Sequence, residues 1–337
     1  MTHFKSFGVL LSVVSLATAA MSAQSAPAGK PAAAKRSAPR TSWGDPDLQG
    51  VWTSDGEMGL PFERPSQYGT KQVLEGEELE EALEQRQEQR VASAPVAGGE
   101  TGAGPTHWFE SWTGKSSRTS MVIDPPDGRV PALTAEAQQR AAARAAAQAA
   151  HGPADSYEDR ALWDRCITRG VPNAAFPTLY NNNSRIVQSP GYVVVMYEMV
   201  HDARIVPLDG RPHVSQKIRA YEGDSRGHFD GDTLVVDTTN FHPKTNYRGA
   251  GDTLHLIERF TRTAAGTLQY DVTVDDPHTF VTPWTARLNL TQQSQLFEYA
   301  CHEGNYAMKH ILSGARADEA EAAKNRRAPR NEGRGEE

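Results

Sequence analysis

The sequence predicts a mainly β protein, in which an antiparallel meander closes into a barrel and carries a few peripheral helices. From Tyr192 onward, short runs rich in Val, Thr and aromatic residues follow one another closely, which is typical of strands. The breaks between them carry the pairs Asp209-Gly210, Asp230-Gly231 and Ala265-Gly266, which favour hairpin turns. A long open meander would leave exposed edges, and closure into a barrel removes them.

The first 23 residues have the order of a secretory signal peptide. Lys5 supplies a positive charge, and an apolar run over 7–20 follows, too short to span a bilayer, which takes about 20 apolar residues. Small residues up to position 23 provide cleavage sites. Residues 24–41, rich in Ala, Pro, Lys and Arg, are predicted to form a disordered leader. We therefore expect a periplasmic or secreted protein.

A single domain is predicted over 42–314, followed by a charged tail over 315–337. Its first half contains three predicted helical segments, near 70–92, 134–150 and 156–166. Thr134 suits the N-cap of the second segment, and alanines supply its helix propensity.

The predicted strands begin with 47–53, where Gly50-x-Trp52 resembles the first strand of lipocalin-type (calycin) barrels. A Trp packed into any β core fits these residues equally well. The remaining strands are predicted near 192–200, 203–207, 215–222, 233–239, 253–263, 267–275, 284–291 and 295–302.

Cys166 and Cys301 are the two cysteines of the chain. An even number of cysteines in an exported protein predicts a disulfide, which requires Cα atoms no more than about 7 Å apart. The bond would tie the end of the third predicted helix to the last predicted strand.

Charge and motifs exclude several classes of function. The formal net charge of −7 argues against nucleic acid as a partner, since binding phosphates needs a basic surface. The sequence contains no GxGxxG, GxxxxGK[ST] or HExxH motif, so no cofactor or metal is predicted. No segment after the signal peptide reaches a membrane-spanning length.

Five phrases together resemble a group of exported bacterial proteins. They are PDLQGVW (46–52), EMVHDAR (198–204), PLDGRPH (207–213), GDTLVVDT (231–238) and YACHEGNY (299–306). The resemblance spans nearly the whole predicted domain. It implies export and a common fold, and it implies no activity.

The densest polar run, 197–204, comes where an apolar strand acquires charges. If the run stays extended, Glu198, Asp202 and Arg204 share one face, because strand side chains alternate. We predict Glu198, Asp202 and His201 as catalytic acid–base residues, since a carboxyl among apolar side chains has a raised pKa. Arg204, paired with Asp202, would orient an anionic or carbonyl ligand. The alternative is a strand end leaving the core, with Arg204 and Asp202 merely paired.

Further ligand-binding candidates come from the β half of the chain. His213 and His278 are histidines that fit no metal-ligand spacing. The aromatic residues Tyr197, Tyr270 and Trp284 would line an apolar cavity or simply fill the core.

The sequence thus favours an exported soluble protein that binds a small, partly apolar molecule in a barrel pocket. Acid–base catalysis on that molecule, of isomerase, lyase or hydrolase type, is a further hypothesis. Two alternatives stay open: a non-catalytic envelope or interaction protein, and a metal-dependent enzyme that uses the histidines.

Overall fold

The computed structural model describes residues 39–93, 114–152, 154–301 and 304–327. The predicted signal peptide and most of the predicted leader lie outside the described residues. In the part that is described, no helix has the length and apolar character needed to cross a membrane.

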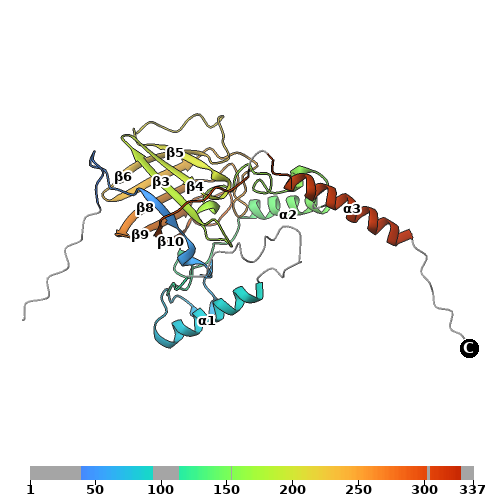
Figure 1. The fold of residues 1–337 in the computed structure, drawn as a ribbon, viewed down its shortest axis with the longest axis horizontal. Helices are drawn as coiled ribbons and strands as arrows, with labels where there is room; N and C mark the ends of the chain where they lie inside the picture. The colour runs from blue at the N-terminus through green and yellow to red at the C-terminus, as the bar shows by residue number, and fades with distance from the viewer. Residues whose placement is uncertain (1–38, 94–113, 153, 302–303, 328–337) are drawn as a thin grey trace, which may run out of the picture. The chain divides into compact units, whose positions relative to one another are not determined.

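The core of the molecule is a ten-stranded antiparallel sheet in the order β5-β4-β3-β1-β10-β9-β8-β7-β6, with β2 paired to β10 (Figure 1). The strand β1 lies between two meanders, β3–β5 and β6–β10. The strands are β1 Gly50–Thr53, β2 Val122–Asp124, β3 Asn183–Ser189, β4 Tyr192–Tyr197, β5 Ala203–Pro207, β6 Asp224–Asp230, β7 Thr233–Thr239, β8 Leu256–Ala264, β9 Thr267–Val274 and β10 Trp284–Gln293.

The sheet curls but does not close into the predicted barrel. Arg204 on β5 reaches Glu258 on β8 across the interior, although the two strands are far apart in the strand order. Between the edge strands β5 and β6, the described residues form no backbone ladder. Side chains meet there instead: a Cβ at Gly227 would lie 2.8 Å from side-chain atoms of Val206 and Leu208. A long connection joins these two strands in place of a hairpin.

One face of the sheet is buried, as the alternation of side chains predicts. Along β9, every second residue from Leu268 to Val274 is buried, and β10 repeats the pattern from Trp284 to Leu290. Trp52 on β1 is fully buried and donates its indole N–H to the carbonyl of Leu48, 3.0 Å away. The sheet's inner face therefore supplies most of the hydrophobic core.

Three α-helices are described: α1 Gly76–Ser93, α2 Ala135–Ala149 and α3 Ala307–Arg327. Thr134 caps α2, and its Oγ1 accepts a hydrogen bond of 3.1 Å from the amide of Ala137. The helix expected over 156–166 is absent from the structure, which has only the 3-10 turn Tyr157–Asp159 there. The predicted charged tail is helical as far as Arg327, where Ala, Glu, Lys and Arg provide strong helix propensity.

The strand predictions were right where apolar residues dominate and wrong where they do not. β5 and β7 occupy the predicted ranges 203–207 and 233–239. The described residues of the ranges 215–222 and 295–302, which end at Cys301 in the second range, form no strand of the sheet. β3 and β6 were missed, because polar residues such as Arg185 and Asp224 interrupt their apolar pattern.

Candidate functional site

A buried ion pair lies inside the curled sheet. Arg204 donates from both terminal nitrogens to Glu258, at 2.7 and 2.8 Å, and the two side chains are 2% and 0% exposed. The hydroxyl of Tyr270 donates to Glu258 at 3.0 Å, and that of Tyr197 accepts from Arg204 at 3.2 Å. Burial is the largest single effect and would lower the pKa of Arg204, but Glu258 together with Tyr197 and Tyr270 outweighs burial and raises that pKa. Three predicted ligand-binding residues, Arg204, Tyr197 and Tyr270, thus meet around Glu258, while the buried Nε of Arg204 makes no hydrogen bond among the described residues.

The polar run after β4 does not stay extended. Val200 and His201 have positive φ angles of 63° and 46°, so the chain turns sharply before β5 begins. Side chains on either side of this turn cannot alternate as they would in a strand. The shared face expected for Glu198, Asp202 and Arg204 is therefore wrong, as is the expected pairing of Asp202 with Arg204.

Glu198 is 2% exposed and holds together two segments distant in sequence. Its carboxylate accepts a hydrogen bond of 2.6 Å from the side-chain amide of Asn183 and one of 2.7 Å from the backbone amide of Phe297. These contacts bind the chain after β10 to the start of β3. The geometry gives Glu198 a structural role, and its predicted catalytic role stays a prediction.

Asp202 lies in a different environment, made by loops. It accepts a hydrogen bond of 2.7 Å from the hydroxyl of Thr168 and one of 3.2 Å from the backbone amide of Arg169. The same Thr168 hydroxyl also contacts Glu222, the residue two positions before β6. Burial raises the pKa of Asp202 and that of Glu222. Sequence reasoning missed Thr168 and Glu222, since a lone polar residue in a loop gives no pattern.

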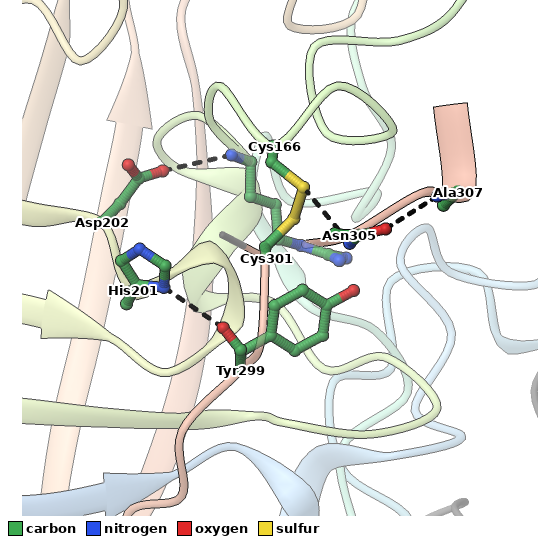
Figure 2. The surroundings of a disulfide bond; sticks show 8 residues. Cys166, His201, Asp202, Tyr299, Cys301, Asn305 and Ala307 are labelled. Carbon is green, nitrogen blue, oxygen red and sulfur yellow. Dashed lines mark hydrogen bonds between the residues drawn. A yellow bond between two sulfur atoms is a disulfide. The ribbon is translucent and has the colours of Figure 1, made fainter. Parts of the chain in front are cut away.

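The predicted disulfide between Cys166 and Cys301 is present, with Cα atoms 5.5 Å apart (Figure 2). It joins a turn-rich segment to the chain after β10, and neither end is regular secondary structure. Nearby, the ring Nδ1 of His201 lies 3.2 Å from the carbonyl oxygen of Tyr299 (Figure 2). The disulfide and this contact hold the chain after β10 against the turns that carry His201 and Asp202.

The other predicted histidines lie apart from this region. His213 lies between two carboxylates. Its Nδ1 is 2.8 Å from Asp224, and its Nε2 is 2.8 Å from Asp237. His255 contacts the second oxygen of Asp237 at 2.7 Å. His278, 58% exposed, lies 3.4 Å from Glu136 near the start of α2.

Trp284 belongs to the apolar core and not to a ligand cavity. Its ring packs edge-on against Phe62 and Phe280, with centroids 5.8 Å away in both cases, and is stacked with Tyr247 at 6.0 Å. Of the aromatic residues predicted to line a cavity, this one fills the interior.

A basic pocket of about 920 Å³ opens between the C-terminal half of α2, the turns over 158–173 and the loop over 243–247. Five cationic side chains and two carboxylates line it, and Thr168 lies in its wall. The cations are Arg144, Arg160, Arg165, Arg169 and Lys244, and the carboxylates are Glu158 and Asp159.

The charges of this pocket are unevenly paired. Lys244 binds Glu158 at 2.8 Å, and Arg160 binds Asp164 at 3.0 Å. Arg169 is partly buried and lies over the Trp163 ring at 5.4 Å, and no described carboxylate lies within ion-pair distance of it. Burial lowers the pKa of Arg169, because its charge has lost water without gaining a counterion.

Among the described residues, no group of three or more His, Cys, Asp or Glu side chains could hold a metal ion. No family model matches the chain, and no curated protein matches it. One solved structure found by the comparison is that of a secretary abundant heat soluble (SAHS) protein from Ramazzottius varieornatus. The two share 12% sequence identity over 40% of this chain and 87% of that chain, with a TM-score of 0.24.

Proposed function

We propose that the protein binds a small, partly apolar anion in the basic pocket. The observation that carries this proposal is the concentration of cations around one cavity in a chain whose formal net charge is −7. Arg169 is central to it, because a partly buried guanidinium without a counterion is unfavourable and a bound anion would compensate its charge.

The chemistry of the lining defines the class of ligand. A guanidinium presents a planar fork of donors that matches a carboxylate, phosphate or sulfonate group. Leu162, Trp163, Val171 and Tyr247 supply an apolar part of the wall. A ligand with an anionic group and a modest apolar body fits both features.

This proposal keeps the class of ligand expected from the sequence but moves the site. The interior of the curled sheet around Arg204 is occupied by an ion pair, with the hydroxyl of Tyr197 bonded to Arg204 and that of Tyr270 bonded to Glu258. The basic pocket lies beside the sheet, among loops, where a ligand has access. We further propose that the protein is exported, which the disulfide supports, because such bonds persist in oxidising compartments.

The test is a fluorescence titration with 8-anilinonaphthalene-1-sulfonate (ANS), an aromatic anion. Arg169→Gln should weaken ANS binding about tenfold to a hundredfold, the value of a lost charged hydrogen bond. Arg259→Gln, which removes a half-exposed arginine on β8 outside the pocket, is the matched control and should bind like the wild type. Inorganic phosphate should compete with ANS. Equal affinity of Arg169→Gln and the wild type would overturn the proposal.

A further inference from the structure

The hydroxyl of Thr168 contacts two carboxyl groups, and its single hydrogen cannot serve both of them if both are ionised. Its Oγ1 lies 2.7 Å from Asp202, also contacts Glu222, and accepts a hydrogen bond of 2.7 Å from the backbone amide of Gly170. A hydroxyl group has one hydrogen to donate and two lone pairs to accept with. The amide of Gly170 uses one lone pair, and one carboxylate takes the hydrogen. The other carboxyl can bond only by donating a proton to the remaining lone pair.

We propose that Asp202 and Glu222 share one proton through Thr168 at neutral pH, and that this proton is coupled to anion binding in the basic pocket. The two carboxyl groups and Thr168 form what we call the carboxyl pair. The coupling rests on the proposed function, whereas the shared proton does not.

The surroundings of the carboxyl pair favour retention of this proton. Burial raises the pKa of both acids, and like charges add to the effect on Glu222, which faces Asp202 and Glu258. The hydrogen bond with Thr168 opposes this rise in the pKa of both acids, and smaller opposing effects come from the amide of Arg169 and His201 for Asp202 and from Arg204 for Glu222.

One oxygen of Glu222 is left without a partner. Its Oε2 is buried and makes no hydrogen bond within the described part of the chain. A buried carboxylate oxygen without a donor is costly, and a protonated carboxyl group places less charge on that atom. This second observation also favours a neutral acid at this position.

The carboxyl pair is connected to the pocket through two adjacent residues. Thr168 and Arg169 both line the pocket, and the backbone amide of Arg169 binds Asp202. An anion bound on Arg169 adds negative charge beside the pair and so strengthens its hold on protons. By linkage, protons strengthen anion binding equally. Affinity for an anion should therefore rise as the pH falls, by at most about tenfold per pH unit for one proton.

Infrared spectroscopy tests the shared proton without any ligand. The wild type at neutral pH should show the carbonyl band of a protonated carboxyl group. Glu222→Gln and Asp202→Asn should each lose it, since either amide can donate to Thr168 in place of the proton. Both variants keep the hydrogen-bond pattern, so thermal unfolding should show that they fold. Glu319→Gln, which changes an exposed glutamate on α3 outside the pocket, is the control and should keep the band. A wild-type band that survives in both variants, or no band at all, would overturn the shared proton.

Calorimetry tests the coupling. ANS binding is measured in two buffers of different ionisation enthalpy, and the sulfonate stays ionised throughout. The wild type should take up a fraction of a proton, and Glu222→Gln should take up much less while still binding ANS. Binding without a buffer effect would refute the coupling and leave the pocket standing. No ANS binding by the wild type would refute the pocket and the coupling together, and the infrared band would still decide the shared proton.

Discussion

Asp202 and Arg204 are two positions apart in the sequence, yet their surroundings differ completely. Arg204 lies on β5 and pairs with Glu258 inside the sheet, where both side chains are almost fully buried. Asp202 lies in a turn and shares one hydroxyl with a second carboxyl group, with a cationic pocket next to it. The first group is matched in charge and the second is not.

The difference follows from the elements that hold each group. Strands fix Arg204 and Glu258 in register with their neighbours, so a bidentate pair forms and the tyrosine hydroxyls complete it. Around Thr168, turns leave two carboxyl groups close together. A buried charge that has an opposite charge beside it is explained by the fold alone, whereas one without such a partner points to a functional site. We therefore expect the interior pair to serve stability, and the proposed ligand binding places its site in the loop region.

The largest expected effect is in the interior. Glu258→Gln leaves Arg204 buried without a counterion and should lower the free energy of unfolding by about 3–5 kcal/mol. Urea denaturation followed by circular dichroism measures it. Replacing both residues together, as Arg204→Met with Glu258→Leu, should recover much of the loss. A single variant as stable as the wild type would break the comparison, because the pair would then not be structural.

The disulfide should come next. Cys166→Ser with Cys301→Ser opens a link between residues separated by 135 positions and should cost about 2–5 kcal/mol. The loss should extend to the loop region, because the bond anchors the turns that carry Thr168 and Asp202. ANS affinity and urea denaturation are measured on the same sample. Lost stability with unchanged ANS affinity would show that the pocket does not depend on this link.

Glu198 sharpens the comparison, since it belongs to the same polar run. In Glu198→Gln, the new side-chain NH2 group would face the N–H donor of Asn183 or Phe297, and two donors cannot bond to each other. The variant should lower the free energy of unfolding by about 1–3 kcal/mol. ANS affinity should stay at the wild-type value in the folded protein. A stable variant that no longer binds ANS would instead support the catalytic or binding role predicted from the sequence.

The smallest effect concerns the exposed histidine–aspartate contacts. The hydrogen bond with Asp237 raises the pKa of His255 above its ordinary value of 6.5. The contribution of protonated His255 to the free energy of unfolding is therefore full below pH 6.5 and disappears as the pH rises through the raised, folded-state pKa. The same bond lowers the pKa of Asp237 below its ordinary value of 3.8. The contribution of ionised Asp237 to the free energy of unfolding is therefore lost as the pH falls through this lowered pKa.

These contacts are partly exposed and screened, so His255→Gln should cost less than about 1 kcal/mol. Urea denaturation from pH 4 to 9 should show the difference from the wild type in the acidic range and its disappearance in the alkaline range. A difference that grows with pH would contradict the assignment.

Much of the fold could be predicted because its signals are local. Residues close together in the sequence determine the Val-rich strands, the Asp-Gly turns and the capped helix that begins after Thr134. The disulfide was predicted from the cysteine count together with export. The strand order could not be predicted, because the pairing of β1 with β3 and β10 depends on residues far away in sequence.

The candidate site could be predicted only in fragments. Asp202 was identified, but its partners Thr168 and Glu222 lie in loops where no periodicity marks them. The sequence predicts that side chains continue to alternate between the two faces of a strand after Tyr197. The strand instead ends there, because Val200 and His201 have positive φ angles. The cations of the pocket come from three separate segments, so only the folded chain brings them together.

The position of β1 has a consequence for how the chain folds. The meanders β3–β5 and β6–β10 join strands that are neighbours in sequence, so each can form from local contacts. Their union through β1 pairs Val51 with Arg185 and with Gln293, which requires two large loops to close. Contacts of such long range form slowly, because the entropy of loop closure is lost before they stabilise the chain. We therefore expect the sheet to be completed last, at its first strand.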